Sequence, residues 1–264
     1  ATAGTGLAPY EYRLDGGAYQ GSGTFSGIAI GNHTITIRDA LFCTYDLPFT
    51  ITQPTVILGS VSSQTSVSCN GGSDGTVTIA ASGGTTPYQY NVDGGAYQAS
   101  NVITGLTAGP HTVTVQDVNL CTVNVPVTIV QPSVLVGTIS LQTNVDCNGN
   151  STGSVTVAGS GGTPPYEYRL DAGAYQASGN FTGLAAGGYS ITVRDANLCI
   201  VNVPVTITQP VILTGSVVSQ TDVLCFGDAT GQVTLTGSGG TPGYQYSLDG
   251  GAYQASPTFM TLTA

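Results

Sequence analysis

The sequence predicts an all-β protein made of tandem small β-sandwich domains of the immunoglobulin-like or fibronectin-like kind. Short segments alternate between apolar and polar residues with a period of two, and glycine-rich turns separate them. No stretch shows a helical period with caps. Hydrophobic residues make up 41% of the 264-residue chain, enough for packed cores, so we do not expect wholesale disorder despite its 38 glycines.

A repeat of 78 residues organises the chain. The tyrosines at 10, 88, 166 and 244 keep this spacing, and so do Gln-Pro pairs at 53–54, 131–132 and 209–210. Proline suits a strand end because it donates no ladder hydrogen bond. Dividing the chain after each Gln-Pro pair predicts a partial repeat at 1–54 from strand B onward and whole repeats at 55–132 and 133–210. A second partial repeat, with strands A to E, follows at 211–264. We expect a piece of a longer repetitive protein.

The second repeat shows the expected elements in order. Strand A ends near residues 66–69, and strands B and C occupy 75–80 and 88–92. Asp93 and two glycines form a tight hairpin, because glycine tolerates positive φ, and lead into a short C′ segment at 96–98. Strands E, F and G follow at 102–104, 111–115 and 122–129. Seven short strands enclose a core that is marginal without further stabilisation.

The charge balance excludes several partners. There are 14 acidic residues against 4 basic ones, giving a net charge of -10, and no lysine is present. Such a chain has no basic patch for a nucleic-acid backbone and no charge that would attract an anionic membrane. No apolar run approaches the length of a membrane span, so we expect no membrane insertion of this piece. Any export signal is expected outside these residues.

The joint order of motifs resembles the SprB repeat. Its parts are Cys-Asn-Gly at 69–71 and 147–149, Ser-Gly-Gly-Thr-x-Pro-Tyr-x-Tyr at 160–168, Gly-Leu-x-Ala-Gly at 183–187 and Asp-Ala-Asn-Leu-Cys at 195–199. Leu198 departs from the pattern where a glycine often precedes the last cysteine, and Phe226 replaces an asparagine. SprB repeats occur in large gliding-motility and surface adhesins of Bacteroidetes. The resemblance implies export by the type IX secretion route and display on the bacterial cell surface, and it names no ligand.

Three functions compete on this basis. The first is an extracellular stalk of a long adhesin that transmits force and displays a binding tip in adhesion or gliding, with the other repeats of the same chain as its partners. The second is a structural subunit of a filament or sheath, in which identical chains are the partners. The third is a carbohydrate-binding module with stacking platforms at Tyr19, Tyr97, Tyr175 and Tyr253, although their place beside a hairpin favours partial burial.

Recurrent aspartates are expected to cap turns. Asp15, Asp93, Asp171 and Asp249 precede the hairpin glycines, and Asp39, Asp117 and Asp195 end strand F. Both positions let a carboxylate accept N–H groups of the turn. Calcium is the sharper alternative, because extracellular repeats bind it with aspartates, but no Asp-x-Asp-x-Asp cluster is present. We therefore predict no metal or other cofactor.

The two histidines are also interpreted as structural. His33 and His111 share the position of Tyr189 at the start of strand F, where sandwiches place a ring that bonds back to the backbone. Catalysis would need an oriented base, and the sequence has neither a Ser-His-Asp set nor a Gly-x-Ser-x-Gly elbow. We predict no enzyme activity and no catalytic residues.

A two-repeat superperiod predicts cross-strand pairs. The first and third copies read Tyr-Glu-Tyr-Arg in strand C and carry arginine in strand F, where the second copy has glutamine at both variable positions. Since C and F are antiparallel neighbours in this fold, Glu11 should face Arg38 and Glu167 should face Arg194 on the outer surface. An exposed ion pair contributes only about 0–1 kcal/mol to the free energy of folding. We therefore interpret these pairs as a feature that sets strand register and distinguishes the surfaces of the copies, and not as a source of stability.

The cysteines leave two main pairings open. Within a repeat, Cys69 could bond Cys121, and Cys147 could bond Cys199, each 52 residues apart. Strand directions favour another pairing. Cys69 ends strand A at one end, or pole, of the sandwich, while the F–G turn with Cys121 lies at the opposite pole. The poles are about 20 Å apart, whereas a disulfide needs Cα atoms within about 7 Å. A head-to-tail array would instead bring Cys69 to Cys199, 130 residues away.

The alternative depends on strand A. If strand A folds back midway, Cys69 returns to the F–G pole and the pairing within the repeat forms. A bond across the linker, from Cys43 to Cys69, is a third arrangement. Under the inter-repeat rule, the cysteines at 43, 121, 147 and 225 pair beyond these residues or stay unpaired.

Overall fold

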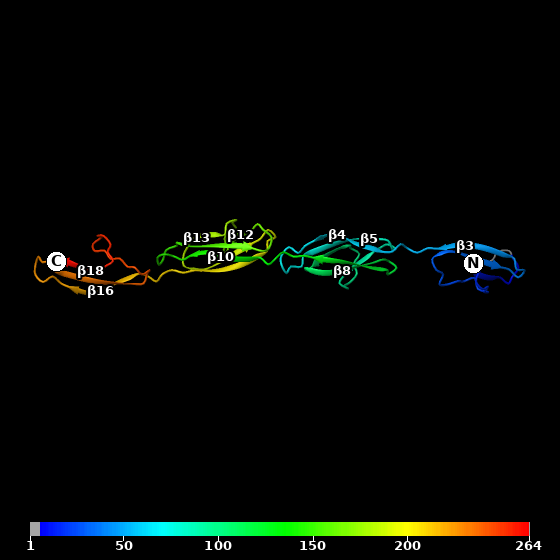
Figure 1. Cartoon of the computed structure of the whole chain (residues 1–264), viewed down its shortest axis with the longest axis horizontal. Helices are drawn as coiled ribbons and strands as arrows, with labels where there is room; N and C mark the ends of the chain where they lie inside the picture. The colour runs from blue at the N-terminus through cyan, green and yellow to red at the C-terminus, as the bar shows by residue number, and fades with distance from the viewer. Residues whose placement is uncertain (1–5, 264) are drawn as a thin grey trace. The chain divides into compact units, whose positions relative to one another are not determined.

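The computed structural model describes residues 6–263, which form 18 β-strands and no helix. The strands make six antiparallel sheets of three strands each (Figure 1). In most of the strands alternate residues are apolar, which gives the sheets one face that can be buried. The predicted all-β architecture of small tandem domains is confirmed.

The two whole repeats have the same six strands. In the second repeat they are β4 (Leu58–Thr65), β5 (Gly75–Ser82), β6 (Gln89–Val92), β7 (Val102–Leu106), β8 (Gly109–Gln116) and β9 (Thr122–Ile129). In the third they are β10 (Val136–Thr143), β11 (Gly153–Ser160), β12 (Glu167–Leu170), β13 (Asn180–Leu184), β14 (Gly187–Arg194) and β15 (Ile200–Ile207). The sheet orders β10-β11-β13 and β12-β14-β15 correspond to A-B-E and C-F-G, the two-sheet arrangement of an immunoglobulin-like sandwich.

The core of the third repeat comes from the alternate residues of both sheets. Val155 and Val157 of β11 and Ile191 and Val193 of β14 are at most 2% exposed. The remaining members of this core are Leu135, Val145, Tyr168, Leu184, Val203, Val205 and Ile207. Thr156 and Thr192 alternate with these valines and isoleucine on β11 and β14, as a period of two requires.

Two details of the strand prediction are wrong. Strand A of the second repeat is Leu58–Thr65, and residues 66–69 belong to the following turn. The C′ segment is not a strand, because Tyr90 and Gln98 form only an isolated bridge. The side-chain Nε2 of Gln98 donates to the carbonyls of Ser100 (2.9 Å) and Val102 (3.0 Å), which folds the chain away from strand C. A whole repeat therefore has six strands and not seven.

The partial repeats contain one sheet each. The first has β1 (Glu11–Leu14), β2 (Gly31–Arg38) and β3 (Thr44–Ile51), which are strands C, F and G. The expected end of strand B falls within residues 1–5, outside the described residues, and the strand E position forms no strand. The last has β16 (Thr214–Thr221), β17 (Gly231–Ser238) and β18 (Thr258–Leu262), with strand C reduced to a bridge at Tyr246. In a whole repeat strand E pairs with strand B, and strand C pairs with strand F. In each partial repeat the strand that does not form is the one whose partner lies outside the described residues.

The chain divides into two compact units that do not follow the repeat boundaries. Over the described residues, the first contains 6–64, 77–103 and 110–128, and the second contains 65–76, 104–109 and 129–263. The second unit holds the whole third repeat together with residues 65–76, the turn that follows strand A of the second repeat. This turn is therefore part of the same compact body as the next repeat.

The Ser-Gly-Gly-Thr motif fixes the start of the third repeat. Gly161 has φ +69° with its backbone against Val134, and an added Cβ would lie 1.9 Å from the Val134 carbonyl oxygen. Gly162 donates its N–H to the Ser133 carbonyl at 2.9 Å. Only glycine allows both the left-handed backbone and this close approach. The motif thus ties the B–C turn to the segment that enters the domain.

Candidate functional site

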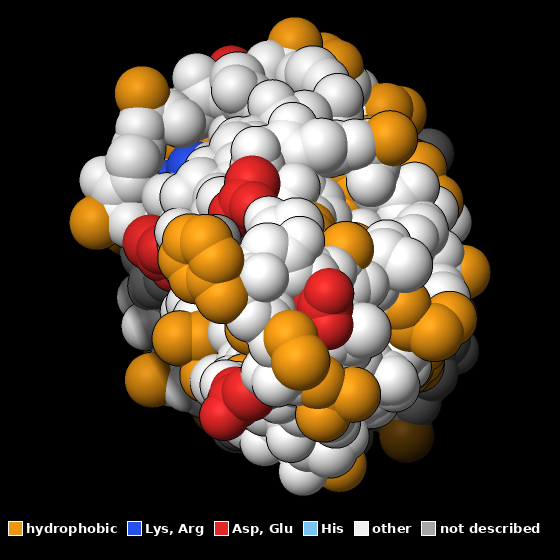
Figure 2. Space-filling view, turned by 90° about the vertical axis from the view of Figure 1, so that its left-hand side faces the viewer, with side chains coloured by type: hydrophobic (Ala, Val, Ile, Leu, Met, Phe, Trp, Pro, Cys, Tyr) orange, Lys and Arg blue, Asp and Glu red, His pale blue; other side chains and the backbone are white. Residues whose placement is uncertain are grey.

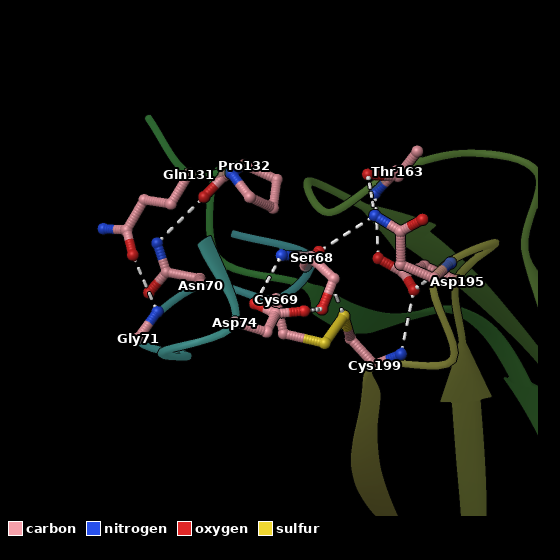
Figure 3. Close-up of a disulfide and its surroundings, with 11 residues drawn as sticks. Ser68, Cys69, Asn70, Gly71, Asp74, Gln131, Pro132, Thr163, Asp195 and Cys199 are labelled. Carbon is pink, nitrogen blue, oxygen red and sulfur yellow. Dashed lines mark hydrogen bonds between the residues drawn. A yellow bond between two sulfur atoms is a disulfide. The ribbon is translucent and has the colours of Figure 1, made fainter. Parts of the chain in front are cut away.

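The candidate site is a disulfide-linked junction between two turns (Figure 3). Cys69, between β4 and β5, is bonded to Cys199, between β14 and β15; their Cα atoms are 5.7 Å apart and 130 residues separate them in sequence. The pairing joins one repeat to the next, and neither pairing within a repeat is formed. The other four cysteines, Cys43, Cys121, Cys147 and Cys225, are free and exposed.

Strand directions in the third repeat explain why Cys147 does not reach Cys199. β11 begins beside Cys147, and its first residue, Gly153, pairs with Leu184 at the end of β13. β14 therefore starts at the pole of Cys147 and runs antiparallel to β12 toward the other pole. Cys199 follows the far end of β14. The two cysteines of one repeat lie at opposite ends of its sandwich.

A buried carboxylate shapes the turn that presents Cys199. Asp195 is 2% exposed, and its Oδ1 accepts the N–H groups of Asn197 and Cys199, both at 2.9 Å. Its Oδ2 accepts the Thr163 N–H at 2.9 Å. The turn then presents Asn197, whose Nδ2 donates to the Ser68 carbonyl at 2.9 Å. By accepting the N–H groups of Asn197 and Cys199, the Asp195 carboxylate caps the F–G turn, which is the role predicted for it.

The equivalent carboxylate in the second repeat has the same environment. Asp117 is 3% exposed and accepts N–H groups from Thr85, Asn119 and Cys121 at 2.9 Å each. The Thr85 N–H in particular, followed by that of Cys121, lowers the pKa of Asp117. Every donor in this set belongs to the protein backbone. The carboxylate therefore has its acceptor capacity used by N–H groups of the F–G turn and of the neighbouring B–C turn.

The turn that carries Cys69 is tied to the linker after its own repeat. Asn70 donates from Nδ2 to the Pro132 carbonyl at 2.9 Å, and the Gly71 N–H donates to Oε1 of Gln131 at 2.7 Å. The third repeat has the same two bonds, from Asn148 to Pro210 and from Gly149 to Gln209, both at 2.9 Å. The Cys-Asn-Gly and Gln-Pro motifs are thus two halves of one contact, which the sequence analysis did not recognise.

A second bond closes the same turn, with its partners exchanged between copies. Ser68 donates its N–H and its hydroxyl to the carboxylate of Asp74, at 2.9 and 2.5 Å, and these bonds lower the pKa of Asp74. In the third repeat the carboxylate stands at the other position, where Asp146 accepts the Thr152 hydroxyl at 2.7 Å. One acid and one hydroxyl are present in both turns, so the contact survives the exchange.

The structure brings the four predicted surface residues together in pairs. Arg38 donates from Nε to Glu11 at 3.1 Å and also from Nη2, and Arg194 donates from Nε to Glu167 at 3.2 Å and from Nη2 at 2.5 Å. All four side chains are between 25% and 47% exposed. In the second repeat, glutamines 89 and 116 take the same register positions.

These arginines also cover two of the four candidate tyrosine platforms. The guanidinium carbons of Arg38 and Arg194 lie 3.7 Å from the ring centroids of Tyr19 and Tyr175. A ring that stacks on an arginine cannot stack on a sugar with the same face. The tyrosines of the other copies, Tyr97 and Tyr253, are 39% and 71% exposed.

The His position contains an ion pair that the sequence analysis missed. His33 contacts Asp15 through Nδ1 at 2.7 Å and the Ala29 carbonyl through Nε2 at 2.9 Å. His111 contacts Asp93 at 2.7 Å in the same way. Asp15 raises the pKa of His33, and His33 with the Thr34 N–H lowers the pKa of Asp15.

The prediction for the hairpin aspartates needs correction at this point. Asp15 and Asp171 do not cap their own hairpin, because they accept the N–H groups of Thr34 and Ser190 on strand F, each at 2.8 Å. They therefore link the C–C′ turn to the neighbouring strand. In the third repeat Tyr189 donates its hydroxyl to the Ala185 carbonyl at 3.0 Å, as expected for a ring that bonds back to the backbone.

The described residues contain no group of three or more His, Cys, Asp or Glu side chains that could hold a metal ion. A hollow of about 630 Å³ lies over β16 and β17, but its lining residues Leu213, Leu235 and Tyr246 correspond to core residues of the third repeat. It is the core face of a sheet.

On the face shown in Figure 2, acidic side chains are spread singly among uncharged and hydrophobic ones.

The family model of the SprB repeat matches the chain three times, at residues 61–97, 139–175 and 217–253. Each match begins in strand A and ends after strand C, so it contains one Cys-Asn-Gly turn or its variant and one Gly-Gly motif. These are tandem domains of an extracellular repeat protein with an adhesin-like role. The chain therefore contains three tandem matches to the SprB repeat.

Solved structures of tandem domains show low similarity. They include three N-terminal domains of the highly immunogenic outer capsid protein of bacteriophage RB49 (14% identity, 70% of each chain, TM-score 0.38). The N-terminal eight Ig domains of Down syndrome cell adhesion molecule give 12% identity over 78% of this chain and 34% of that one, with a TM-score of 0.34. A C-terminal fragment of intimin gives 17% identity over 62% and 67%, with a TM-score of 0.32. No curated protein matches the chain.

The disulfide fits a location at the cell surface or outside the cell, because disulfides persist in oxidising compartments. Among the described residues, no helix has the length and apolar character needed to cross a membrane.

Proposed function

We propose that the chain is a stalk segment of a bacterial cell-surface adhesin, which transmits force and holds a binding tip away from the cell. The observation that carries this proposal is the covalent and hydrogen-bonded junction, in which Cys69–Cys199 and Asn197–Ser68 join successive repeats. Ligand-binding modules do not need a covalent bond to the next module, whereas a load-bearing array gains from it. The partners are then the other repeats of the same long chain.

The SprB resemblance supports the cellular setting of this proposal. It implies export by the type IX route and a part in adhesion or gliding at the surface of a Bacteroidetes cell. Four carboxylates, those of Asp195, Asp15, Asp74 and Glu11, bind turn or strand N–H groups, a hydroxyl or an arginine, which supports a structural role for them.

The test is replacement of the repeats in the parent surface protein. Deleting the array while keeping the tip should abolish adhesion, and inserting an equal number of unrelated disulfide-linked sandwich domains should restore it. Restoration would show that the repeats act by length and strength. Failure of the unrelated array to restore adhesion, together with specific binding of the purified chain to a glycan array, would contradict the stalk and favour a carbohydrate-binding module.

Lateral assembly into a filament is the second candidate, and one observation favours it. Strand β10 lies at the edge of its sheet and exposes Val136 (41%), Ile139 (41%) and Leu141 (63%). An exposed edge strand with apolar side chains is a template for pairing with another chain. Electron microscopy of the purified chain separates the two, since a filament shows helical symmetry and a stalk shows separate molecules.

A further inference from the structure

We infer that the Cys69–Cys199 bond takes residues 70–198 out of the path along which the chain bears tension. The inference deepens the proposed stalk function and explains how the stalk would resist pulling. A force that enters before Cys69 and leaves after Cys199 crosses from one sulfur to the other. The residues between them form a closed covalent loop.

The loop contains most of two domains. Its strands run from β5 to β14, so the second repeat has only strand A outside the loop and the third repeat has only strand G outside it. Even if these strands separate from one another, an end-to-end pull cannot straighten residues 70–198 while the disulfide is intact. The cores of both repeats are therefore protected from complete extension.

Strand β15 becomes the tension-bearing element of the third repeat. It leaves Cys199 directly, and its eight residues all pair with β14, from Ile200 opposite Arg194 to Ile207 opposite Gly187. Val203, Val205 and Ile207 anchor it in the core with 1–8% exposure. Tension therefore enters β15 at Cys199 and leaves beyond Ile207, while β14 lies inside the closed loop and carries none of it.

Successive loops would overlap, because the bond spans 130 residues and the repeat is only 78. Cys147 and Cys225 occupy the same turn as Cys69, and Cys121 occupies the same turn as Cys199. Where the array continues with this period, Cys147 would close a loop that shares residues 147–199 with the first. Each such bond forms by thiol–disulfide exchange with an oxidised dithiol, which takes up the two electrons and two protons.

Overlap leaves little chain that can extend. After a bond ends at Cys199, only 26 residues lead to Cys225, where the next bond of the same series begins. The bonds from Cys121 and Cys147 belong to a second series of the same kind. Two parallel covalent routes would then run along the array, and opening one bond would leave the other route continuous.

Single-molecule force spectroscopy tests the bypass on the full 264-residue chain held by its two ends. Adding a reductant should lengthen the fully unfolded oxidised chain by about 45 nm, which is the extended length of about 130 residues at 3.3–3.6 Å each. The double variant Cys69→Ser, Cys199→Ser should show the longer length without reductant. The matched control Cys121→Ser, Cys147→Ser removes two free thiols and should behave as the parent chain.

Two results would overturn the inference. A gain of about 18 nm on reduction would reveal a loop of about 52 residues and hence a bond within one repeat. No gain would mean that no covalent bypass exists. Because each oxidised molecule is its own reduced control, folding of the variants does not decide the outcome. The adhesion experiment above can fail while the length gain is observed, and this combination would reject the stalk function alone.

Discussion

Three bulky residues of the F–G turns adopt a backbone conformation that favours glycine. Phe42, Leu120 and Leu198 have φ between +63° and +67°, and each immediately precedes a cysteine. These residues are 68–72% exposed, so little packing offsets the strain of a Cβ in the left-handed region, although the Phe42 ring lies 5.1 Å from the guanidinium carbon of Arg38. This explains in physical terms why a glycine often stands at the position in SprB repeats.

We therefore expect Leu198→Gly to stabilise the third repeat by about 0.5–1 kcal/mol, since relief of backbone strain exceeds the entropy that glycine adds to the unfolded chain. Urea denaturation of parent and variant gives the difference in the free energy of unfolding. Leu198→Ala is the control, because it shortens the exposed side chain and keeps the Cβ. Equal gains in both variants would show that removal of the exposed side chain, and not backbone strain, is responsible.

The His33–Asp15 pair predicts a pH dependence of stability. The raised pKa of His33 adds stability that is complete below its ordinary value of 6.5 and is lost as the pH rises through the raised value. The lowered pKa of Asp15 adds stability that is present above 3.8 and is lost as the pH falls through the lowered value. The contribution of the pair should be greatest between about pH 4 and 6.5.

The third repeat provides the control, because Tyr189 bonds the backbone at the same position with a phenol in place of an imidazole. The double variant His33→Tyr, His111→Tyr should lose less stability than the parent between pH 5.5 and 8.5. Urea midpoints at both pH values give this comparison, and an NMR titration gives the pKa of each histidine directly. A pKa of His33 at or below 6.5 would contradict the interpretation.

Among the elements, the B–C turn leaves no room for a side chain at Gly161. Gly161→Ala should cost at least about 2 kcal/mol, because it adds a clash with the Val134 carbonyl to the strain of a positive φ. Gly149→Ala is a matched control, with φ +85° and nothing within 4 Å of the added Cβ, and should cost about 1 kcal/mol. Equal costs, measured by denaturation, would mean that the close approach to Val134 contributes nothing.

The paired strands C and F predict a weak ionic coupling. A double-mutant cycle with Glu167→Gln and Arg194→Gln, which reproduces the residues of the second repeat, should give a coupling energy below about 1 kcal/mol. The arginine variant should cost more than the glutamate variant, because it also removes the stacking on Tyr175. A coupling above about 2 kcal/mol would show that these pairs stabilise the domain substantially.

Most strands could be predicted because their apolar residues alternate, and strand A could not. In β4 every residue except Gly59 is exposed, and the strand is rich in serine, so alternation gives no signal for its position. The alternation of strand directions favoured Cys69 near Cys199 but left the pairing within a repeat open, and it counted a C′ strand that the structure reduces to an isolated bridge. The bonds from Asn70 and Gly71 to the Gln-Pro linker could not be foreseen, because a side chain that binds the backbone 60 residues away leaves no periodic pattern.

At the scale of the molecule, the junction repeats one set of contacts. The Cys-Asn-Gly turn binds the Gln-Pro linker in both whole repeats, and the buried aspartate at the end of strand F orders the turn that carries the second cysteine in both. A repeat that contains both halves of its junction can be added or removed without a change in the interface. The length of such an array can therefore vary while its junctions stay the same.

The position of the disulfide also determines what a protease can do to the chain. Trypsin cleaves after lysine and arginine, and the only four such residues are Arg13, Arg38, Arg169 and Arg194. Cuts after the last two fall between Cys69 and Cys199, so the fragments that carry these two cysteines should stay attached and migrate together on a gel until a reductant is added. Separation without reductant would contradict this. A surface protein built in this way can be nicked across most of two domains and still keep hold of whatever lies beyond them.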